Sequence, residues 1–409
     1  MPDAADALRA RCCVAGGGPA GMMLGYLLAR AGVEVVVLEK HADFLRDFRG
    51  DTVHPSTLQV LHELGLLEEF LRRPHQEVSE IGAVIGGERV SVADFSHLPT
   101  RARFVAFMPQ WEFLDFLAEQ ARKLPAFALR MRTEAVGLLQ EDGRVVGVRA
   151  VGPDGPLKLR AELVVAADGR GSLLRDAAGL EVMDIGAPMD VLWLRLSRKE
   201  GDPRRVMGYF GQGHVFVMLD RGDYWQCGFV IPKGALETLH RGDVAWLRGE
   251  IAALVPFLGD RVGELRSWDD AKLLTVKVDR LREWSKPGLL CIGDAAHAMS
   301  PVGGIGINLA IQDAVAAGNL LAPALRRGAP TPAELRAVQR RREWPTRLTQ
   351  AGQIVAQNRV IAPTLAGADV RVPLPLRLFD RFPWLRRLPA RAIGLGIRPE
   401  HVRLQSIDG

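Results

Sequence analysis

Cysteine is scarce in this chain, and its placement excludes two classes of protein. The 409 residues contain four cysteines, Cys12, Cys13, Cys227 and Cys291, and each lies in or beside an apolar run. No two of them have the spacing of a metal-ligand pair, so we expect neither a zinc site or other bound metal nor a disulfide framework. Reduced cysteines of this kind indicate a cytoplasmic protein.

A targeting or membrane-spanning segment is not expected either. The uncharged stretch from Cys12 to Ala29 is long enough to resemble a membrane span. It contains five glycines and one proline, however, and Asp3 and Asp6 precede it, which suits neither a bilayer helix nor the basic start of a signal peptide. The chain also shows no internal repeat and no low-complexity tract.

Neither charge sign dominates the composition. The 53 basic and 48 acidic residues give a net charge of +5, and 48% of the residues are hydrophobic. This balance is typical of a soluble globular protein, and the length predicts about two to three domains. No nucleic-acid partner is expected. The basic residues concentrate late, since residues 371–403 hold eight arginines against Asp380 and Glu400.

The apolar pattern predicts that the chain opens with a βαβ unit. A buried strand over residues 11–15, a glycine turn and a helix over about 20–31 precede a second strand over 33–38. Much later, the apolar run 288–292 and a helix over about 306–325 return the chain to the same parallel sheet. The nucleotide-binding domain is therefore predicted to be discontinuous.

The middle of the chain is predicted to form a second, antiparallel sheet. Strand-like runs separated by Gly and Asp turns cover residues 191–196, 205–210, 215–219 and 224–231. The remaining predicted elements are short alternating runs over 75–110, a helix over 111–123, strands near 127–138 and 144–151, a helical stretch over 244–258 and a strand near 272–281.

A glycine-rich turn opens the first helix. Gly16, Gly18 and Gly21 fit the pattern GxGxxG, in which the glycines allow a tight turn, the approach of a pyrophosphate and close packing of helix on strand. Glu39 follows 18 residues after Gly21, at the end of the second strand, where a carboxylate can bind an adenosine ribose. The pattern alone does not distinguish flavin from nicotinamide, and a glycine turn without a ligand is the alternative.

Two further blocks, far apart in the chain, identify the cofactor. The second block runs from Val164 to Ser172 and contains Asp168-Gly169; the third begins with Gly293-Asp294 and continues through Pro301 to Asp313-Ala314. With these three blocks in this order, the sequence resembles the class A flavoprotein monooxygenases, the para-hydroxybenzoate hydroxylase-like family.

The resemblance implies an α/β fold with two domains and a helical tail. A Rossmann-like FAD-binding domain with a parallel sheet precedes and follows a substrate domain with a mostly antiparallel sheet, and a C-terminal helical region ends the chain. The implied boundaries are 1–74, 102–182 and 286–330 for the FAD domain, 75–101 and 183–285 for the substrate domain, and 331–409 for the C-terminal region.

The resemblance also implies which residues contact FAD, held non-covalently. Asp294 would bind the ribityl chain, and the segment Gly303 to Asn308 would lie beside the pyrimidine edge of the flavin ring. For Asp168-Gly169, a turn that closes a strand is the alternative. The full set is Gly16, Gly18, Pro19, Ala20, Gly21, Glu39, Lys40, Arg49, Gln110, Ala135, Asp168, Gly169, Asp294, Pro301, Gly304, Gly306, Ile307 and Asn308.

Two histidines near these blocks receive no catalytic role. His297 belongs to the third block, where shaping the strand-to-helix turn is favoured over acid/base chemistry. His54 precedes Pro55 in a predicted loop and is interpreted as solvated, with a position facing the substrate as the alternative. Because the flavin itself is the catalyst, no catalytic side chain is assigned.

The implied activity is oxygenation of a small aromatic or other electron-rich apolar molecule. NADH or NADPH would act as a transient reductant of FAD, and O2 would react through a flavin C4a-hydroperoxide. Four aromatic residues on predicted strands are substrate candidates, with a core role as the alternative: Trp193, Tyr209, Phe216 and Trp225. The alternative functions are a same-fold reductase or halogenase, a membrane-associated epoxidase with an external reductase, and a non-catalytic flavin-binding regulator. The WxWxIP segment of halogenases is absent.

The C-terminal region combines apolar and basic residues. Leucine, phenylalanine and tryptophan alternate with arginine between Leu374 and Arg391, and four prolines prevent one long helix. Closing the apolar face of the domain is favoured, and weak peripheral contact with an anionic membrane is the alternative.

Overall fold

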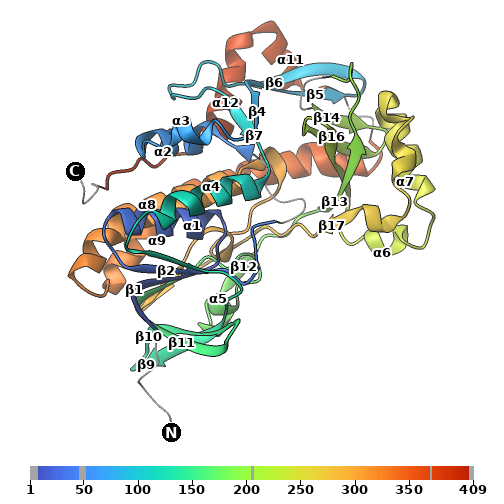
Figure 1. Ribbon diagram of the computed structural model, residues 1–409. Coiled ribbons are helices and arrows are strands. Elements are labelled where there is room, and N and C mark those ends of the chain that lie inside the picture. The colour runs from blue at the N-terminus through green and yellow to red at the C-terminus, as the bar shows by residue number, and fades with distance from the viewer. Residues whose placement is uncertain (1–7, 46–51, 204–206, 369–370, 405–409) are drawn as a thin grey trace.

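The computed structural model describes residues 8–45, 52–203, 207–368 and 371–404. Its elements form two sheets joined by long helices that cross the molecule between them (Figure 1). The parallel sheet lies at the lower left of this view and the mostly antiparallel sheet at the upper right. The predicted fold class is confirmed.

The parallel sheet carries the first motif. Its strand order is β19-β20-β11-β1-β2-β8, and β1, the central strand, pairs in parallel with β11 and β2, so that Cys13 lies between Val164 and Val36. The hairpin of β9 and β10 extends β11 in antiparallel fashion. The strand bounds are β1 Leu8–Ala15, β2 Val35–Leu38, β8 Phe127–Arg130, β9 Glu134–Glu141, β10 Arg144–Gly152, β11 Gly155–Ala166, β19 Ser285–Lys286 and β20 Leu289–Cys291.

Helix α1 (Pro19–Arg30) packs directly on the parallel sheet. A Cβ on Gly25 would lie 2.7 Å from Val37 and 2.9 Å from Phe127, so a glycine is needed at this contact. Helices α4 (Gln110–Arg122) and α8 (Gly306–Arg327) pack on α1, and α9 (Pro332–Ala356) packs on α8.

Helix α8 is apolar and long enough to cross a membrane, but it is a core helix. In the segment 302–327, 72% of the apolar window is buried inside the molecule. The four cysteines are likewise buried, and each is a free thiol.

The second sheet has seven strands in the order β17-β13-β16-β15-β14-β5-β6. All neighbours are antiparallel except β14 and β5. Helices α6 (Leu236–Leu239) and α7 (Ala245–Leu254) lie at one side of this sheet. The strand bounds are β5 Glu80–Ile85, β6 Glu88–Asp94, β13 Met189–Ser197, β14 Met207–Gly211, β15 His214–Asp220, β16 Tyr224–Pro232 and β17 Lys272–Leu274.

Short elements join the two sheets. The strands form two small sheets, and the C-terminal helices lie at the top of Figure 1. The bounds are β3 Thr52–Val53, β4 Gln76–Val78 and β7 Val105–Phe107 in one small sheet, β12 Val182–Asp184 and β18 Asp279–Leu281 in the other, and helices α2 Pro55–Glu63, α3 Leu67–Phe70, α5 Leu173–Ala177, α10 Ala362–Leu365, α11 Leu374–Arg381 and α12 Arg387–Gly394.

Three predicted elements are corrected. The strand near 272–281 is two strands in different sheets, because the backbone around Val276 bonds to side chains: its N–H donates to Asp190 and its carbonyl accepts from Lys233. The strand near 127–138 is likewise divided, into β8 and β9. The helical stretch predicted over 244–258 is interrupted at Val255, because the residue before a proline disfavours helix: α7 ends at Leu254 and a short 3-10 helix follows over Pro256–Leu258.

Candidate functional site

The glycine turn between β1 and α1 leaves an open space at the start of the helix. A Cβ on Gly16 would lie 2.2 Å from the Ala167 carbonyl oxygen, and one on Gly21 would lie 2.0 Å from the Gly16 carbonyl oxygen, so both positions require glycine. A Cβ on Gly18, by contrast, would meet no atom within 4 Å. Gly18 is also the N-cap of α1, which has no side-chain cap. Free backbone N–H groups at an open helix start form an anion site.

Glu39 lies beside this turn at the end of β2. Its carboxylate accepts hydrogen bonds from the backbone N–H of Gly17 and of His41, each at 3.0 Å, and its side chain is 8% exposed. The Thr133 N–H donates to the Glu39 carbonyl oxygen at 2.9 Å, which brings the nearby Ala135 to the same end of the sheet. The structure therefore holds a fixed carboxylate next to the anion site.

Arg170 and Asp294 bring the second and third blocks together. Arg170 Nε donates to Asp294 Oδ2 at 3.0 Å across 124 residues of sequence. Asp168 Oδ2 accepts from the Leu174 N–H at 3.3 Å, while its Oδ1 is buried without a partner among the described residues. Burial raises the pKa of Asp168. An unpartnered buried carboxylate oxygen indicates a missing ligand group.

Asn308 fixes the loop that precedes α8. Its Nδ2 donates to the carbonyl oxygens of Thr52 and Gly304 at 3.2 and 3.4 Å, and its Oδ1 accepts from the His54 N–H at 2.9 Å and from Thr57 Oγ1 at 2.7 Å. Gly304 has a φ of 62°, in the left-handed region, and its carbonyl oxygen also accepts from Thr52 Oγ1 at 2.9 Å. The loop is thus held rigid just before the uncapped start of α8 at Gly306.

A buried network of polar and charged side chains around Asp313 supports the third block. His297 Nε2 lies 2.6 Å from Asp313 Oδ2, which also accepts from the Gly293 N–H at 3.1 Å, and Arg342 Nε donates to Asp313 Oδ1 at 3.0 Å. Burial opposes ionisation of Asp313, but His297 and Arg342 together hold its pKa below the ordinary value. The three side chains are fully or almost fully buried, so His297 shapes the turn rather than contacting solvent.

The prediction that His54 is solvated is wrong. Its side chain is completely buried, between the Asn308 loop and α12, because its backbone N-caps α2. Nδ1 lies 2.8 Å from the Ile393 carbonyl oxygen and therefore carries the proton, since a carbonyl only accepts. Burial lowers the pKa of His54 to about 4. Nε2 has no partner in the described part of the chain and is a free acceptor.

The other cofactor candidates are scattered around these groups. Gln110 begins α4 and is half-buried, and Lys40 is exposed and pairs with Glu134 at 3.7 Å. Arg49 lies outside the described residues. Pro19, Ala20, Gly169, Pro301 and Ile307 lie within the turns and helix starts described above.

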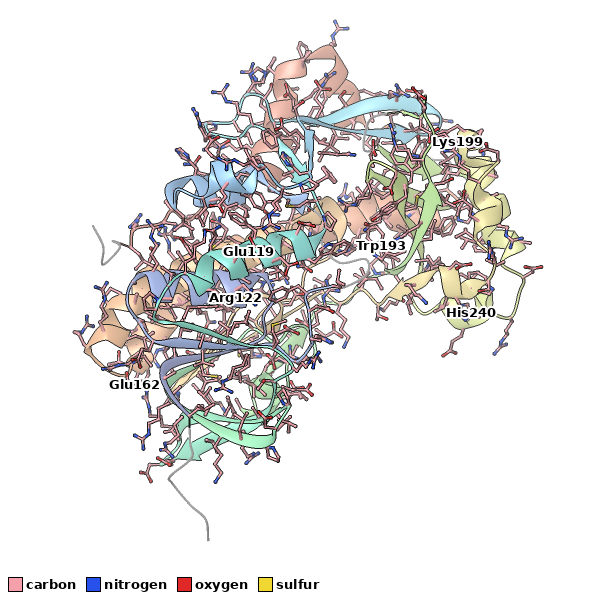
Figure 2. The ribbon with its side chains drawn as sticks, in the orientation of Figure 1. Glu119, Arg122, Glu162, Trp193, Lys199 and His240 are labelled. Atoms are coloured by element: carbon pink, nitrogen blue, oxygen red, sulfur yellow. The ribbon has the colours of Figure 1, made fainter. Side chains whose placement is uncertain are left out.

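The four aromatic substrate candidates do not share a face of the second sheet. Phe216 and Trp225 are completely buried and pack, with the half-buried Tyr209, against α7 and the turns that follow it. Trp193, labelled in Figure 2, lies on the opposite face, between a cluster that contains Phe107 and another that contains Val302. A ligand on the Trp193 side therefore does not reach the other three residues.

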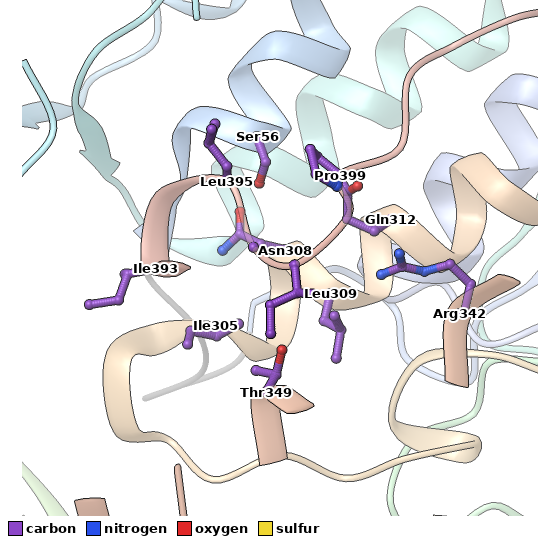
Figure 3. Close-up of a pocket in the computed structure, with 12 residues that line it drawn as sticks. Ser56, Ile305, Asn308, Leu309, Gln312, Arg342, Thr349, Ile393, Leu395 and Pro399 are labelled. Atoms are coloured by element: carbon purple, nitrogen blue, oxygen red, sulfur yellow. The ribbon is translucent and has the colours of Figure 1, made fainter. Parts of the chain in front are cut away.

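A small cavity lies beside Asn308 (Figure 3). It is bounded by α2, α8, α9 and the segment after α12, and its volume of about 10 Å³ suits one water molecule. Gln312 Nε2, on its wall, is buried without a partner among the described residues. The cavity is therefore a hydration site and too small for an organic ligand.

Several residues of this site were not predicted from the sequence. Arg170 stood inside the second block without a role, and Thr52 and Arg342 lie outside all three blocks. The pairing of Arg170 with Asp294 could have been suspected from two opposite charges in blocks that share one sheet edge. Nothing in the sequence marks Thr52 or Arg342, because their partners are 252 and 29 residues away.

This arrangement defines a dinucleotide-binding flavoprotein. An open glycine turn, a fixed carboxylate after the second strand, an unpartnered Asp168 oxygen and a rigid loop at the start of α8 fit FAD. The comparisons with known proteins agree. Residues 9–351 match the family described as FAD binding domain.

Two curated relatives are enzymes. The chain is 34% identical over 405 residues to 6-methylpretetramide 4-monooxygenase of Streptomyces rimosus, covering 98% of this chain and 95% of that protein. It is 31% identical over 314 residues to rifampicin monooxygenase of Streptomyces venezuelae, covering 74% of this chain and 61% of that longer protein. The chain therefore belongs to the class A FAD-binding monooxygenases: it is an FAD-dependent monooxygenase, an oxidoreductase.

Solved structures show the same fold. PqsL of Pseudomonas aeruginosa superposes with a TM-score of 0.74 at 22% identity, covering 88% of this chain and 99% of that chain. The anhydrotetracycline hydroxylase OxyS of Streptomyces rimosus superposes with a TM-score of 0.71 at 24% identity, covering 95% of this chain and 76% of that chain.

Proposed function

We propose that this enzyme hydroxylates an aromatic small molecule of the tetracycline type, with NADH or NADPH as reductant and O2 as the oxygen source. The nearly full-length similarity to 6-methylpretetramide 4-monooxygenase supports this substrate class. The observation that best supports the proposal is that three blocks far apart in the sequence meet at one site that fits FAD. A cytoplasmic location, inferred from the reduced cysteines, accompanies the proposal.

The residues that would hold FAD follow the carboxyl ends of β1, β2, β11 and β20, at one edge of the parallel sheet. The space at Gly18 and the start of α1 receive the pyrophosphate, and Glu39 binds the adenosine ribose. Asp294 holds the ribityl chain, and the loop 303–308 contacts the flavin ring. The proposed FAD domain comprises 1–74, 102–182 and 286–330, and the substrate domain 75–101 and 183–285.

The chain's own residues prepare the reaction by orientation, charge and exclusion of water. FAD, when bound, supplies the redox chemistry that links the nicotinamide to O2. The N–H groups at the start of α8 favour negative charge in front of them, and the bonds of Asn308 keep that helix start in place. The apolar side chains around Trp193 keep water from the substrate face.

His54 is proposed to orient a bound hydroxyl group. Its neutral ring keeps an acceptor at Nε2, and its donor at Nδ1 is already engaged with the Ile393 carbonyl oxygen. A neutral acceptor matches a phenolic O–H, because an imidazolium would only donate.

A turnover screen tests the proposal. Purified holoenzyme is given NADH or NADPH in turn with tetracycline-type phenols, simple phenols and non-aromatic isoprenoids, while nicotinamide oxidation, O2 consumption and product mass are recorded. We expect a tetracycline-type compound to accelerate nicotinamide oxidation with one oxygen atom recovered in the product. Hydroxylation only with an added reductase would favour the membrane-associated epoxidase alternative. Stimulation by simple phenols alone would overturn the substrate class.

A further inference from the structure

The C-terminal helices expose an unusual number of large apolar side chains. Five of them project from α11, α12 and the turn between, with exposed fractions of 40–71%, and we call this set the C-terminal patch: Leu374, Leu378, Phe382, Trp384 and Leu388. The helices that carry the patch stand at the top edge of the molecule in Figure 1. Clusters of exposed apolar residues on this scale mark interaction surfaces.

Four arginines on and near the patch helices have no acidic partner in the part of the chain that the structure describes. Arg377, Arg381, Arg391 and Arg398 are exposed, and none has an ion-pair partner among the side chains that the structure describes. Glu400, which follows them in sequence, is buried and pairs instead with Arg341. The surface is therefore apolar and strongly cationic at the same time.

A shallow groove adjoins the patch and carries two of these arginines. Its volume is about 420 Å³, and its walls include Leu388, Arg391, Ile397 and Arg398. Two guanidinium groups at one groove suit a phosphate, to which arginine donates paired hydrogen bonds. An apolar wall beside them suits the chain attached to such a phosphate.

The charge distribution selects among the partners of this surface. Two copies of the patch facing one another would bring these arginines together, and like charges repel. A neutral apolar partner would bury the guanidinium groups without compensation. An anionic bilayer satisfies both features, because tryptophan, phenylalanine and leucine enter the acyl boundary while arginine stays at the phosphates.

We propose that the C-terminal patch docks this enzyme on an anionic lipid surface. The other face of helix α12 packs in the core of the protein. There, Ala390 and Ile393 join the cluster that contacts Trp193, and the Ile393 carbonyl oxygen binds His54. One helix thus connects the docking surface with the proposed substrate side. The uptake of apolar substrate from the bilayer rests on the proposed function, whereas docking itself does not.

Flotation of the holoenzyme with vesicles tests the docking. Vesicles of phosphatidylcholine alone are compared with vesicles that also contain phosphatidylglycerol, at low and high salt. We expect flotation with the anionic vesicles only and a marked loss at high salt. Equal flotation with both vesicles, or none at low salt, overturns the proposal and leaves the proposed function untouched, because no turnover is measured.

Matched variants distinguish vesicle binding through the C-terminal patch from non-specific adsorption. Trp384→Ser should reduce vesicle binding about tenfold, whereas Trp344→Ser should leave it unchanged. These tryptophans are 60% and 57% exposed, and they lie in the turn between α11 and α12 and on α9, respectively. Arg377→Gln combined with Arg391→Gln should give a similar loss at unchanged flavin content. Equal binding of the two tryptophan variants overturns the proposal. The proposal is also overturned if Trp384→Ser leaves vesicle binding unchanged and instead converts a dimer into a monomer, because the patch would then be an interface between copies of this chain.

Discussion

Acid should destabilise this enzyme through His54 at a pH where most proteins are still fully stable. The side chain is completely buried, and burial lowers its pKa from 6.5 to about 4. Between these values the unfolded chain binds a proton that the folded chain rejects, so the free energy of unfolding falls as the pH is lowered from about 6.5 toward 4. A pKa difference of this size corresponds to roughly 3 kcal/mol, a large part of the stability of a typical domain.

Urea unfolding of the wild type and of His54→Asn isolates this contribution. The asparagine amide can still donate to the Ile393 carbonyl oxygen but does not titrate, so all other ionisable groups cancel between the two proteins. The stability advantage of the wild type over the variant should shrink by roughly 2–3 kcal/mol between about pH 7.5 and pH 4.5. Excess FAD in every sample keeps cofactor loss from contributing.

A difference that stays constant over this pH range would refute the reasoning. It would mean that His54 accepts a proton in the folded state at its ordinary pKa, and therefore that the ring reaches water.

Further substitutions test the site. Gly18→Ala should leave the melting temperature of the apoprotein unchanged and weaken FAD binding, whereas Gly21→Ala should lower the melting temperature, since its Cβ would lie 2.0 Å from a backbone oxygen. Glu39→Ala should weaken FAD binding by roughly 1.5–3 kcal/mol, and an unchanged Kd in a fluorescence titration would contradict the ribose assignment. Asp294→Ala should give folded protein with little flavin absorbance; full flavin content would mean that the third block is misassigned. Asp313→Asn should lower the free energy of unfolding by about 3–5 kcal/mol in urea, and a loss below about 1 kcal/mol would show that the network is dispensable.

The parts of the fold that sequence could predict are those set by short local patterns. Gly16, Gly18 and Gly21 follow a buried strand at fixed spacing. Gly16 and Gly21 meet backbone atoms that lie within a few residues or beside the neighbouring strand, whereas Gly18 borders open space. The opening βαβ unit and the third block were predictable for this reason. Family resemblance then added FAD, which the glycine turn alone could not specify.

The orientation of the second sheet was not predictable from the sequence. Strand β16 is buried at every position from Trp225 to Ile231, because α7 covers one face and other segments cover the opposite face. A strand covered on both sides shows no alternation of apolar and polar residues, so nothing in its sequence distinguishes the two faces. Trp193 and Phe216 therefore looked equivalent, although they lie on opposite sides.

The prediction of one continuous strand near 272–281 was wrong for a different reason. The alternation from Leu273 to Val278 fits a strand, but the backbone at Val276 pairs with the side chains of Asp190 and Lys233 instead of with a neighbouring strand. Asp190 is 86 residues away from its partner, so a local pattern carries no information about this competition. Side chains that satisfy a backbone segment from a distance end strands that propensity alone would extend.

The C-terminal segment matters to a site whose motifs end at residue 314, because it supplies distant partners for the buried groups of the third block. Arg342 joins Asp313 to Glu400, at 3.0 and 3.6 Å, and Asp313 in turn holds the Gly293 N–H at the start of the third block. These charges are buried, so each depends on the others to offset the cost of leaving water. The segment after α12 thereby stabilises the turn that is proposed to carry Asp294, while Ile393 within α12 fixes the ring of His54. The local motifs specify where the cofactor binds, and part of the rigidity of that place comes from Arg342, Glu400 and Ile393, which no motif includes.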